Sequence, residues 1–161
     1  MPTAAHQLVR TLRQLDVDRV FCVPGESYLP ALDALAEDMG IDLVTCRHES
    51  GAGLMAVADA KMTARPGVAF VSRGPGATNA ALAVHTAEQD GAPMVLVIGQ
   101  LPRENLTRGV FQKIDYERTF VDMAKWVVEV RDGSRLAETV ANAFRVATEG
   151  TPGPVVISVP E

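Results

Sequence analysis

Short apolar runs alternate along the chain with segments whose apolar residues recur every three or four positions. The spaced pattern predicts helices at 5–15, 29–36, 49–64, 77–89, 116–124 and 136–147. The continuous runs, bounded by Gly, Pro and polar residues, predict strands at 19–23, 41–46, 68–72, 94–98, 125–130 and 155–159. The inward stripe of the helix at 49–64 is expected to consist of Leu54, Val57, Ala58 and Met62.

The regular alternation of these elements predicts the fold class. Strands that are apolar throughout are typical of a parallel sheet covered on both faces. We therefore expect an α/β fold with a parallel central sheet and helices on both faces. A length of 161 residues suits one compact core, so 1–161 is expected to be a single domain. Ligands of such sheets bind at the carboxyl ends of the strands, so the residues just after each strand are candidates for a site.

The charge balance and the apolar runs exclude several classes of partner. The net charge is −5, which leaves no basic surplus for a nucleic acid or an anionic membrane surface. The longest apolar runs are far shorter than the roughly 20 residues that span a bilayer, and the N-terminus has no signal-peptide pattern. We expect a cytoplasmic protein. Its two cysteines and three histidines have no metal-ligand spacing, so no metal site is expected on this chain.

A long loop follows the fourth predicted strand. The segment 100–115 is polar, contains Pro102 and Gly109 and has no hydrophobic period. Loops of this length inside a compact domain are usually functional. The loop is therefore a second place to look for site residues.

A glycine-rich turn, Gly74-Pro75-Gly76, follows one predicted strand and opens a helix. A dinucleotide-binding loop has this position, but the third glycine of that fingerprint and the ribose-binding acid are both absent. No Gly-Lys-Ser/Thr follows, so it is not a phosphate-binding P-loop. A tight turn with proline at a helix start explains the glycines. It does not explain Thr78 and Asn79 in the first exposed turn.

Glu49 follows another strand directly and is surrounded by the small residues Gly51, Ala52 and Gly53. Small residues allow a flat ligand or a second backbone to approach closely. The alternative is a solvated acid that stabilises a helix N-terminus. The residue alone does not decide between these interpretations.

Five segments taken together resemble one family. They are Val23-Pro24-Gly25-Glu26, Arg47-His48-Glu49-Ser50-Gly51-Ala52, Ser72-Arg73-Gly74-Pro75-Gly76-Ala77-Thr78-Asn79, Phe111-Gln112 and Gly150-Thr151-Pro152-Gly153-Pro154-Val155. In this order, over nearly the whole chain, they resemble the N-terminal pyrimidine-binding domain of thiamine-diphosphate-dependent enzymes. The resemblance is to the acetolactate synthase, benzoylformate decarboxylase and pyruvate oxidase group. It implies the thiamine-diphosphate-binding fold of the pyrimidine type.

The resemblance implies a role for each matching residue. Glu49 would be catalytic, because the matching glutamate bonds N1′ of the aminopyrimidine and favours the imino tautomer that deprotonates the thiazolium. The residues implied to bind the cofactor are Pro24, Gly25, Glu49, Pro75, Thr78 and Asn79. Gln112, with Phe111, would reach toward a small 2-oxo acid substrate. Pro24-Gly25 as a plain turn and Gln112 as a solvated loop residue stay open as alternatives.

The chain lacks one half of the site that the resemblance implies. Family members hold the cofactor diphosphate through Mg²⁺ bound by a Gly-Asp-Gly motif and an Asn, and neither occurs at that spacing here. We expect the diphosphate-binding domain on the same or another chain, so this chain is a split subunit or a fragment, forms a homo-oligomer and is inactive alone. Arg73 and Lys113 depart from the acetolactate synthase pattern, which puts the substrate in question and not the cofactor.

Two other functions remain as alternatives. A non-catalytic module that keeps the fold for dimerisation or regulation would have no use for Glu49. A nicotinamide-binding domain is disfavoured by the incomplete glycine fingerprint. The small-residue helix from Ala77 to Ala87 is a candidate contact for another subunit, or part of the core.

Overall fold

The computed structural model describes residues 3–107 and 109–161 and contains one six-stranded parallel sheet. The strand order is β2-β1-β3-β4-β6-β5, and each neighbouring pair is parallel. The strands are β1 (Arg19–Cys22), β2 (Asp42–Thr45), β3 (Gly67–Val71), β4 (Met94–Gln100), β5 (Trp126–Glu129) and β6 (Pro154–Pro160). The α-helices are α1 (Ala4–Gln14), α2 (Leu29–Glu37), α3 (Glu49–Thr63), α4 (Pro75–Gln89), α5 (Tyr116–Phe120) and α6 (Leu136–Thr148). The predicted α/β class is confirmed.

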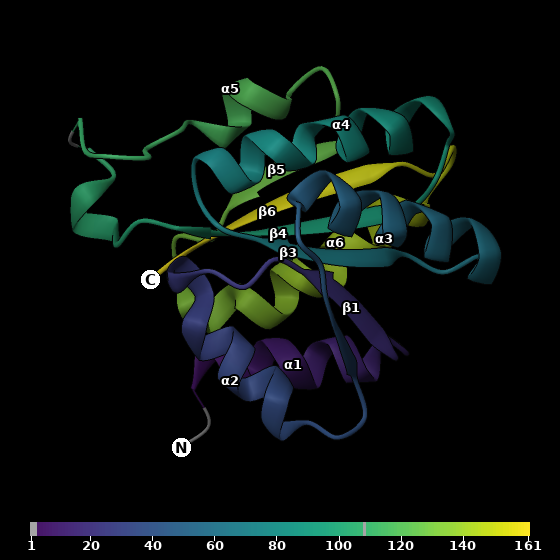
Figure 1. The fold of residues 1–161 in the computed structure, drawn as a ribbon, viewed down its shortest axis with the longest axis horizontal. Helices are drawn as coiled ribbons and strands as arrows, with labels where there is room; N and C mark the ends of the chain where they lie inside the picture. Colours follow the sequence, from purple (N-terminus) through teal and green to yellow (C-terminus); the bar gives the residue numbers. More distant parts are fainter. Residues whose placement is uncertain (1–2, 108) are drawn as a thin grey trace.

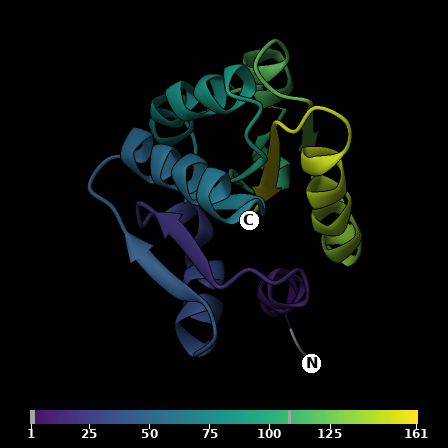
Figure 2. The ribbon, with the colours of Figure 1, turned by 90° about the vertical axis from the view of Figure 1, so that its right-hand side faces the viewer.

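Helices cover both faces of the sheet, as Figures 1 and 2 show from two directions. One buried cluster joins α1, α2 and α6 to residues such as Val20, Phe70 and Val97. The other joins α3, α4 and α5 to residues such as Leu96 and Val156. Successive strand residues therefore alternate between two cores, which is why the strands are apolar throughout.

The element boundaries differ from the predicted ones in a few places. Helix α4 begins at Pro75, two residues early, because proline is well suited to the first turn of a helix. Helix α5 ends at Phe120, short of the predicted 124. The long loop carries one short 3₁₀ turn, Arg103–Asn105, and otherwise has no regular structure before α5.

The predicted inward stripe of α3 is correct only at Val57 and wrong at Leu54, Ala58 and Met62. Leu54 and Met62 are 38% and 87% exposed, and the buried face consists of Ala52, Gly53, Ala56, Val57 and Ala60. Helix α3 packs against α4 so closely that a Cβ at Gly53 would overlap the Cβ of Ala83. Only small residues fit between these two helices, so the larger apolar side chains are left on the outside.

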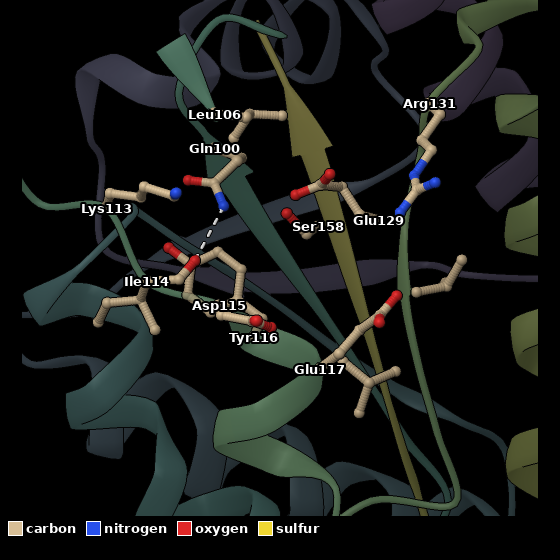
Figure 3. A pocket seen from close by; sticks show the side chains of 12 residues that line it. Gln100, Leu106, Lys113, Ile114, Asp115, Tyr116, Glu117, Glu129, Arg131 and Ser158 are labelled. Atoms are coloured by element: carbon tan, nitrogen blue, oxygen red, sulfur yellow. Dashed lines mark hydrogen bonds between the residues drawn. The ribbon is translucent and has the colours of Figure 1, made fainter. Parts of the chain in front are cut away.

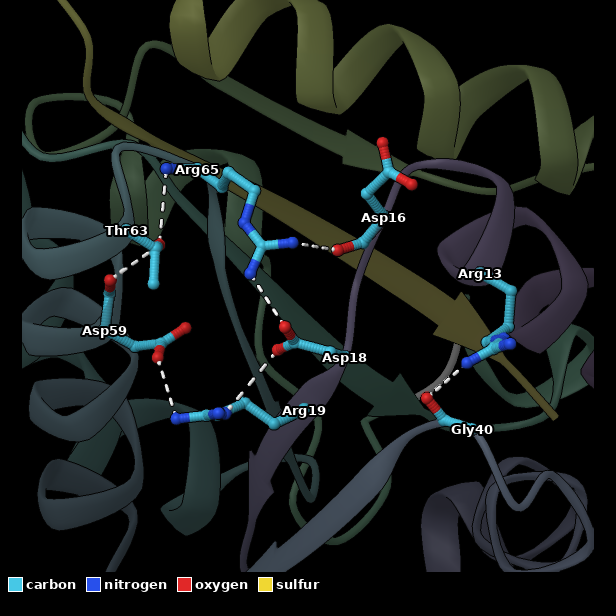
Figure 4. A network of polar contacts seen from close by, with 8 residues as sticks. All are labelled: Arg13, Asp16, Asp18, Arg19, Gly40, Asp59, Thr63 and Arg65. Carbon is cyan, nitrogen blue, oxygen red and sulfur yellow. Dashed lines mark hydrogen bonds and ion pairs between the residues drawn. The ribbon is translucent and has the colours of Figure 1, made fainter.

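A polar network closes the amino edge of the sheet (Figure 4). Arg65, after α3, donates to Asp18 Oδ2 at 2.8 Å and to the Asp16 carbonyl at 2.6 Å. Arg19 reaches Asp59 on α3 at 3.4 Å. The hydrogen bond and charge of Arg65 hold the pKa of Asp18 below its ordinary value of 3.8. The network connects the start of β1 to the end of α3, on the edge opposite the carboxyl ends of the strands.

Within residues 3–107 and 109–161, no helix is both long and apolar enough to cross a bilayer.

Candidate functional site

Glu49 is the first residue of α3, four positions after β2 ends at Thr45. His48 is the N-cap, and its Nδ1 accepts a hydrogen bond from the Ser50 amide at 3.2 Å. His48 therefore caps α3 with its side chain. The cap fixes the first turn of α3 at the carboxyl edge of the sheet, so the Glu49 side chain starts from a defined backbone position.

The Glu49 carboxylate is held by a residue of the neighbouring helix. Asn79 Nδ2 on α4 donates to Glu49 Oε2 at 2.9 Å. A second bond, from the Ser50 hydroxyl to the Asn79 carbonyl at 2.5 Å, joins the two helix N-termini. Within the described residues, Glu49 Oε1 has no hydrogen-bond partner. One oxygen is thus fixed and the other is free for a ligand.

Glycine makes room beside this carboxylate. A Cβ at Gly76 would lie 3.4 Å from Glu49 Oε1 and 3.4 Å from the Ser72 Cβ. A Cβ at Gly25 would lie 2.7 Å from the same Ser72 Cβ. Ser72 therefore connects the turn after β1 to the turn after β3, and the structure brings Gly25, Gly76 and Glu49 to one place.

The turn that contains Gly74 contacts the long loop. Gly74 has φ +61°, a conformation that favours glycine, and a Cβ there would lie 2.8 Å from the Gln112 Cβ. Gln112 itself has φ +64°. The buried Tyr116 hydroxyl accepts a hydrogen bond from the Gly74 amide at 3.0 Å. Gln112 is thereby brought to the glycine turn, whereas Phe111 is 84% exposed.

Pro75 and Thr78 have local structural roles. Pro75 is the first residue of α4. The Thr78 hydroxyl donates to the Gly74 and Pro75 carbonyls at 3.1 and 3.0 Å. Its position in the first exposed turn is therefore explained by backbone hydrogen bonding, and Pro75, Thr78 and Asn79 share the same end of α4.

Arg73 links two parts of the carboxyl edge. Its guanidinium pairs with Glu26 at 2.5 Å and with Glu161 at 2.8 Å, and its side chain is 13% exposed. Its backbone amide donates to the Ser27 hydroxyl at 3.2 Å. Arg73 thus ties the turn next to Gly25 to the end of β6, with its charge matched by two carboxylates.

The charge of Glu49 acts on the buried Tyr28 phenol. Burial raises the pKa of the Tyr28 phenol, and the charges of Cys22 and Glu49 add to the rise. The Tyr28 hydroxyl donates to the Val23 carbonyl. Within the described residues, no group of three or more His, Cys, Asp or Glu side chains is placed to hold a metal ion.

Sequence reasoning missed Tyr116 as a support of the site. No local pattern connects it to Gly74, 42 positions earlier. The alanines of α4 were a candidate subunit contact, with the core as the alternative. Ala80, Ala83 and Ala87 are fully buried in the cluster shared with α3, so the core alternative is confirmed.

Comparison with known proteins identifies relatives. Residues 2–119 match the family model of the thiamine pyrophosphate enzyme, N-terminal TPP binding domain. The catalytic subunit of mitochondrial acetolactate synthase from Aspergillus candidus is 39% identical over 93% of this chain and 22% of its own length. The large subunit of acetolactate synthase isozyme 1 from Escherichia coli is 35% identical over 99% of this chain and 28% of its own. Acetolactate synthase from Bacillus subtilis is 36% identical over 98% and 27%. The chain therefore spans about a quarter of the length of these relatives.

Proposed function

This chain belongs to the N-terminal TPP-binding domains of thiamine pyrophosphate enzymes, and from that premise we propose that Glu49 activates thiamine diphosphate in an acetolactate synthase-like enzyme. The observation that carries the proposal is the carboxylate geometry. Asn79 holds Glu49 Oε2 at 2.9 Å, and Oε1 is left for a ring nitrogen. A carboxyl group in this position can share a proton with the aminopyrimidine and so select its tautomer.

The residues around Glu49 fit an aminopyrimidine. Glycine at position 76 leaves space beside the carboxylate, because a Cβ there would lie 3.4 Å from Glu49 Oε1. When bound, thiamine diphosphate supplies the carbanion chemistry that the decarboxylation or carboligation of a 2-oxo acid requires. The protein contributes orientation and proton control. Pro24 and Gly25 would line the pyrimidine pocket, and Asn79 would keep the carboxylate directed at the ring.

The other predicted residues have supporting parts in this proposal. Pro75 and Thr78 lie in the first turn of the helix that carries Asn79, so they would support its position at the cofactor. Gln112, beside the Gly74 turn, would face the substrate, and Phe111 would close the site from the same loop. The substrate is proposed to be a small 2-oxo acid, and the reaction a lyase or transferase reaction.

A partner domain is part of the proposal. Residues 1–161 would form one pyrimidine-binding domain, and a diphosphate-binding domain on the same or another chain would hold the diphosphate and Mg²⁺. An exposed apolar surface lies on the helices that carry Glu49 and Asn79. It consists of Leu54, Met55, Met62 and Leu82. Exposed apolar groups of this kind favour docking of another domain or a second copy.

Replacing Glu49 by Gln in the assembled enzyme tests the function. The amide keeps the shape but cannot exchange a proton, so exchange of the cofactor C2 proton with deuterium and turnover of pyruvate should each fall by roughly 10²-fold or more. Glu88→Gln, at the far end of α4, is the matched control and should leave both unchanged. Near-normal activity of Glu49→Gln would instead favour a non-catalytic module for dimerisation or regulation.

The isolated chain provides an independent check. Given thiamine diphosphate, Mg²⁺ and pyruvate without a second polypeptide, it should show no turnover, because charged contacts to the diphosphate supply much of the binding energy. Turnover by the 161 residues alone would contradict the proposed need for a diphosphate-binding domain.

A further inference from the structure

Three neighbouring strands change from apolar to polar on the same face of the sheet. On the face covered by α4 and α5, β4 ends in Gln100, β6 carries Ser158 and β5 ends in Glu129. The inward residues before them belong to the apolar cluster: Leu96 and Ile98, Val156, and Val127. The register places Ser158 level with Glu129 on one side. The core on this face therefore ends in a row of polar side chains.

The end of the long loop encloses a cavity over these strand ends (Figure 3). Residues 113–117 form one wall and the strand ends form the other, and the volume is about 200 Å³. This corresponds to the space of roughly seven water molecules in the liquid, so it suits a small metabolite and not a nucleotide. Glu49, Asn79 and Gly25 do not line it. The cavity is separate from the proposed cofactor site.

Ser158 is an unpartnered polar group on the inner wall. It is 1% exposed, and its hydroxyl has no hydrogen-bond partner in the part of the chain that the structure describes. Buried side-chain polar groups are normally hydrogen-bonded, so an unpartnered hydroxyl on a cavity wall indicates a missing partner. Gln100 is already bonded, to the Ile114 carbonyl at 3.3 Å and from the Leu101 amide at 3.0 Å.

The charged side chains that line the cavity lie at different depths. Glu129 is half-buried and lies beside Ser158 on the adjacent strand. Burial raises the pKa of the Tyr116 phenol, and the charge of Glu129 contributes to the rise, in agreement with a carboxylate close to this wall. Lys113 and Arg131 are exposed at the rim, and within the described residues neither side chain forms an ion pair. The inner end is thus anionic and hydroxylated, and the rim carries two cations, Lys113 and Arg131, together with the exposed carboxylates of Asp115 and Glu117.

We propose that this cavity binds a small amino acid, with its ammonium group against Glu129 and Ser158 and its carboxylate toward Lys113 and Arg131. An ammonium group would donate to the unpartnered Ser158 hydroxyl and to the Glu129 carboxylate, which are both acceptors. The two rim cations would pair with the carboxylate. A simple anion would face Glu129 at the inner end.

Titration of the ¹⁵N-labelled 161-residue chain with L-alanine tests this site by NMR. Saturable shifts are expected at the amides of Gln100, Glu129 and Ser158. Ethylamine lacks the carboxylate of alanine and propionate lacks its ammonium group, so each should bind at least about tenfold more weakly. No saturable shift at these amides up to about 50 mM L-alanine, far above a millimolar Kd, would overturn the proposal.

Two conservative variants and one control identify the contacts. Glu129→Gln and Ser158→Ala should each weaken L-alanine binding by roughly tenfold, because each removes one acceptor from the ammonium group. Glu104→Gln, on the same loop but outside the cavity, should leave the affinity unchanged. The amide spectrum of each variant reports whether it is folded. Equal affinity in the folded Glu129→Gln variant, or equal affinity for alanine, ethylamine and propionate, would overturn the proposed contacts and with them the amino-acid site.

Discussion

Asn79 and Glu49 lie on different helices, and the Asn79 amide donates a hydrogen bond to Glu49 Oε2 at 2.9 Å. A carboxylate at a helix start is otherwise free to adopt several rotamers. The contact therefore selects one orientation of the acid. Because Ser50 also binds the Asn79 carbonyl, the two helix ends and the carboxylate form one unit.

Replacing Asn79 by Ala should slow cofactor activation in the assembled enzyme without removing the acid. A hydrogen bond to a charged group contributes about 1.5–3 kcal/mol, so we expect a loss of roughly tenfold or more in kcat. The measurement is the rate of C2 deuterium exchange together with the pH–rate profile, whose acidic limb should move. Asn142→Ala on α6 is the control. An unchanged profile with normal exchange would show that Asn79 does not position Glu49.

Two glycines of α3 should respond to alanine in opposite directions. A Cβ at Gly53 would overlap Ala83, so Gly53→Ala should destabilise the fold by about 1–3 kcal/mol through overpacking. A Cβ at Gly51 meets nothing within 4 Å. Gly51→Ala should stabilise the helix by up to about 1 kcal/mol, since alanine has the higher helix propensity. Urea denaturation of both variants measures the difference, and equal effects would contradict the close packing of α3 on α4.

Removing the Tyr116 hydroxyl should destabilise the fold more than removing that of Tyr28. Tyr116→Phe leaves the Gly74 amide without its acceptor, at a cost of about 1–3 kcal/mol. Tyr28→Phe leaves a carbonyl, and under-satisfied carbonyls are better tolerated than unpaired N–H groups. Urea midpoints at neutral pH compare the two variants. A larger loss for Tyr28→Phe would contradict this ranking.

Alkaline pH should destabilise the protein through the same two phenols. Burial raises the pKa of Tyr28 and of Tyr116 above the ordinary value of 10.0. A group whose pKa is raised on folding contributes stability that is complete below the unfolded pKa and is lost as the pH rises above it. We therefore expect unfolding free energies to fall above about pH 10. Ultraviolet absorbance should show tyrosinate forming together with unfolding, and tyrosinate forming near pH 10 in the intact fold would refute this.

Asp18 should contribute a small amount of stability at neutral pH, and this amount should be lost at acid pH. Its pKa is lowered by Arg65, so its stabilisation is complete above the ordinary value of 3.8 and is lost as the pH falls below it. The pair is exposed, with about half of the Asp18 side chain accessible, so the effect should stay below about 1 kcal/mol. Asp18→Asn should reduce stability at pH 7 and make no difference near pH 2. An Asn variant equal to the native chain at pH 7 would show that the pair contributes nothing.

The sequence by itself determined the elements and the edge of the sheet that carries the proposed site. Hydrophobic period separates helices from strands because each has its own repeat, and strands apolar throughout require a sheet with two covered faces. The turns that contain Gly25 and Gly74, and Glu49 after β2, could therefore be assigned to one edge of the sheet from the sequence alone. Their order along the chain carried the family resemblance, which the comparisons confirm.

Only the tertiary structure decided which side chains meet. Asn79 and Glu49 are 30 positions apart, and Tyr116 and Gly74 are 42 apart, so no local pattern could pair them. The inward face of α3 was mispredicted because hydrophobicity ranks Leu54 above Gly53, whereas the space left by α4 admits only the glycine. The polar cavity also depends on the tertiary structure, because Gln100, Ser158 and Glu129 become neighbours only through the strand order β4-β6-β5. The hydrophobic period of a sequence reflects which residues favour burial. The packing in three dimensions determines how much space each side chain has and which residues it contacts.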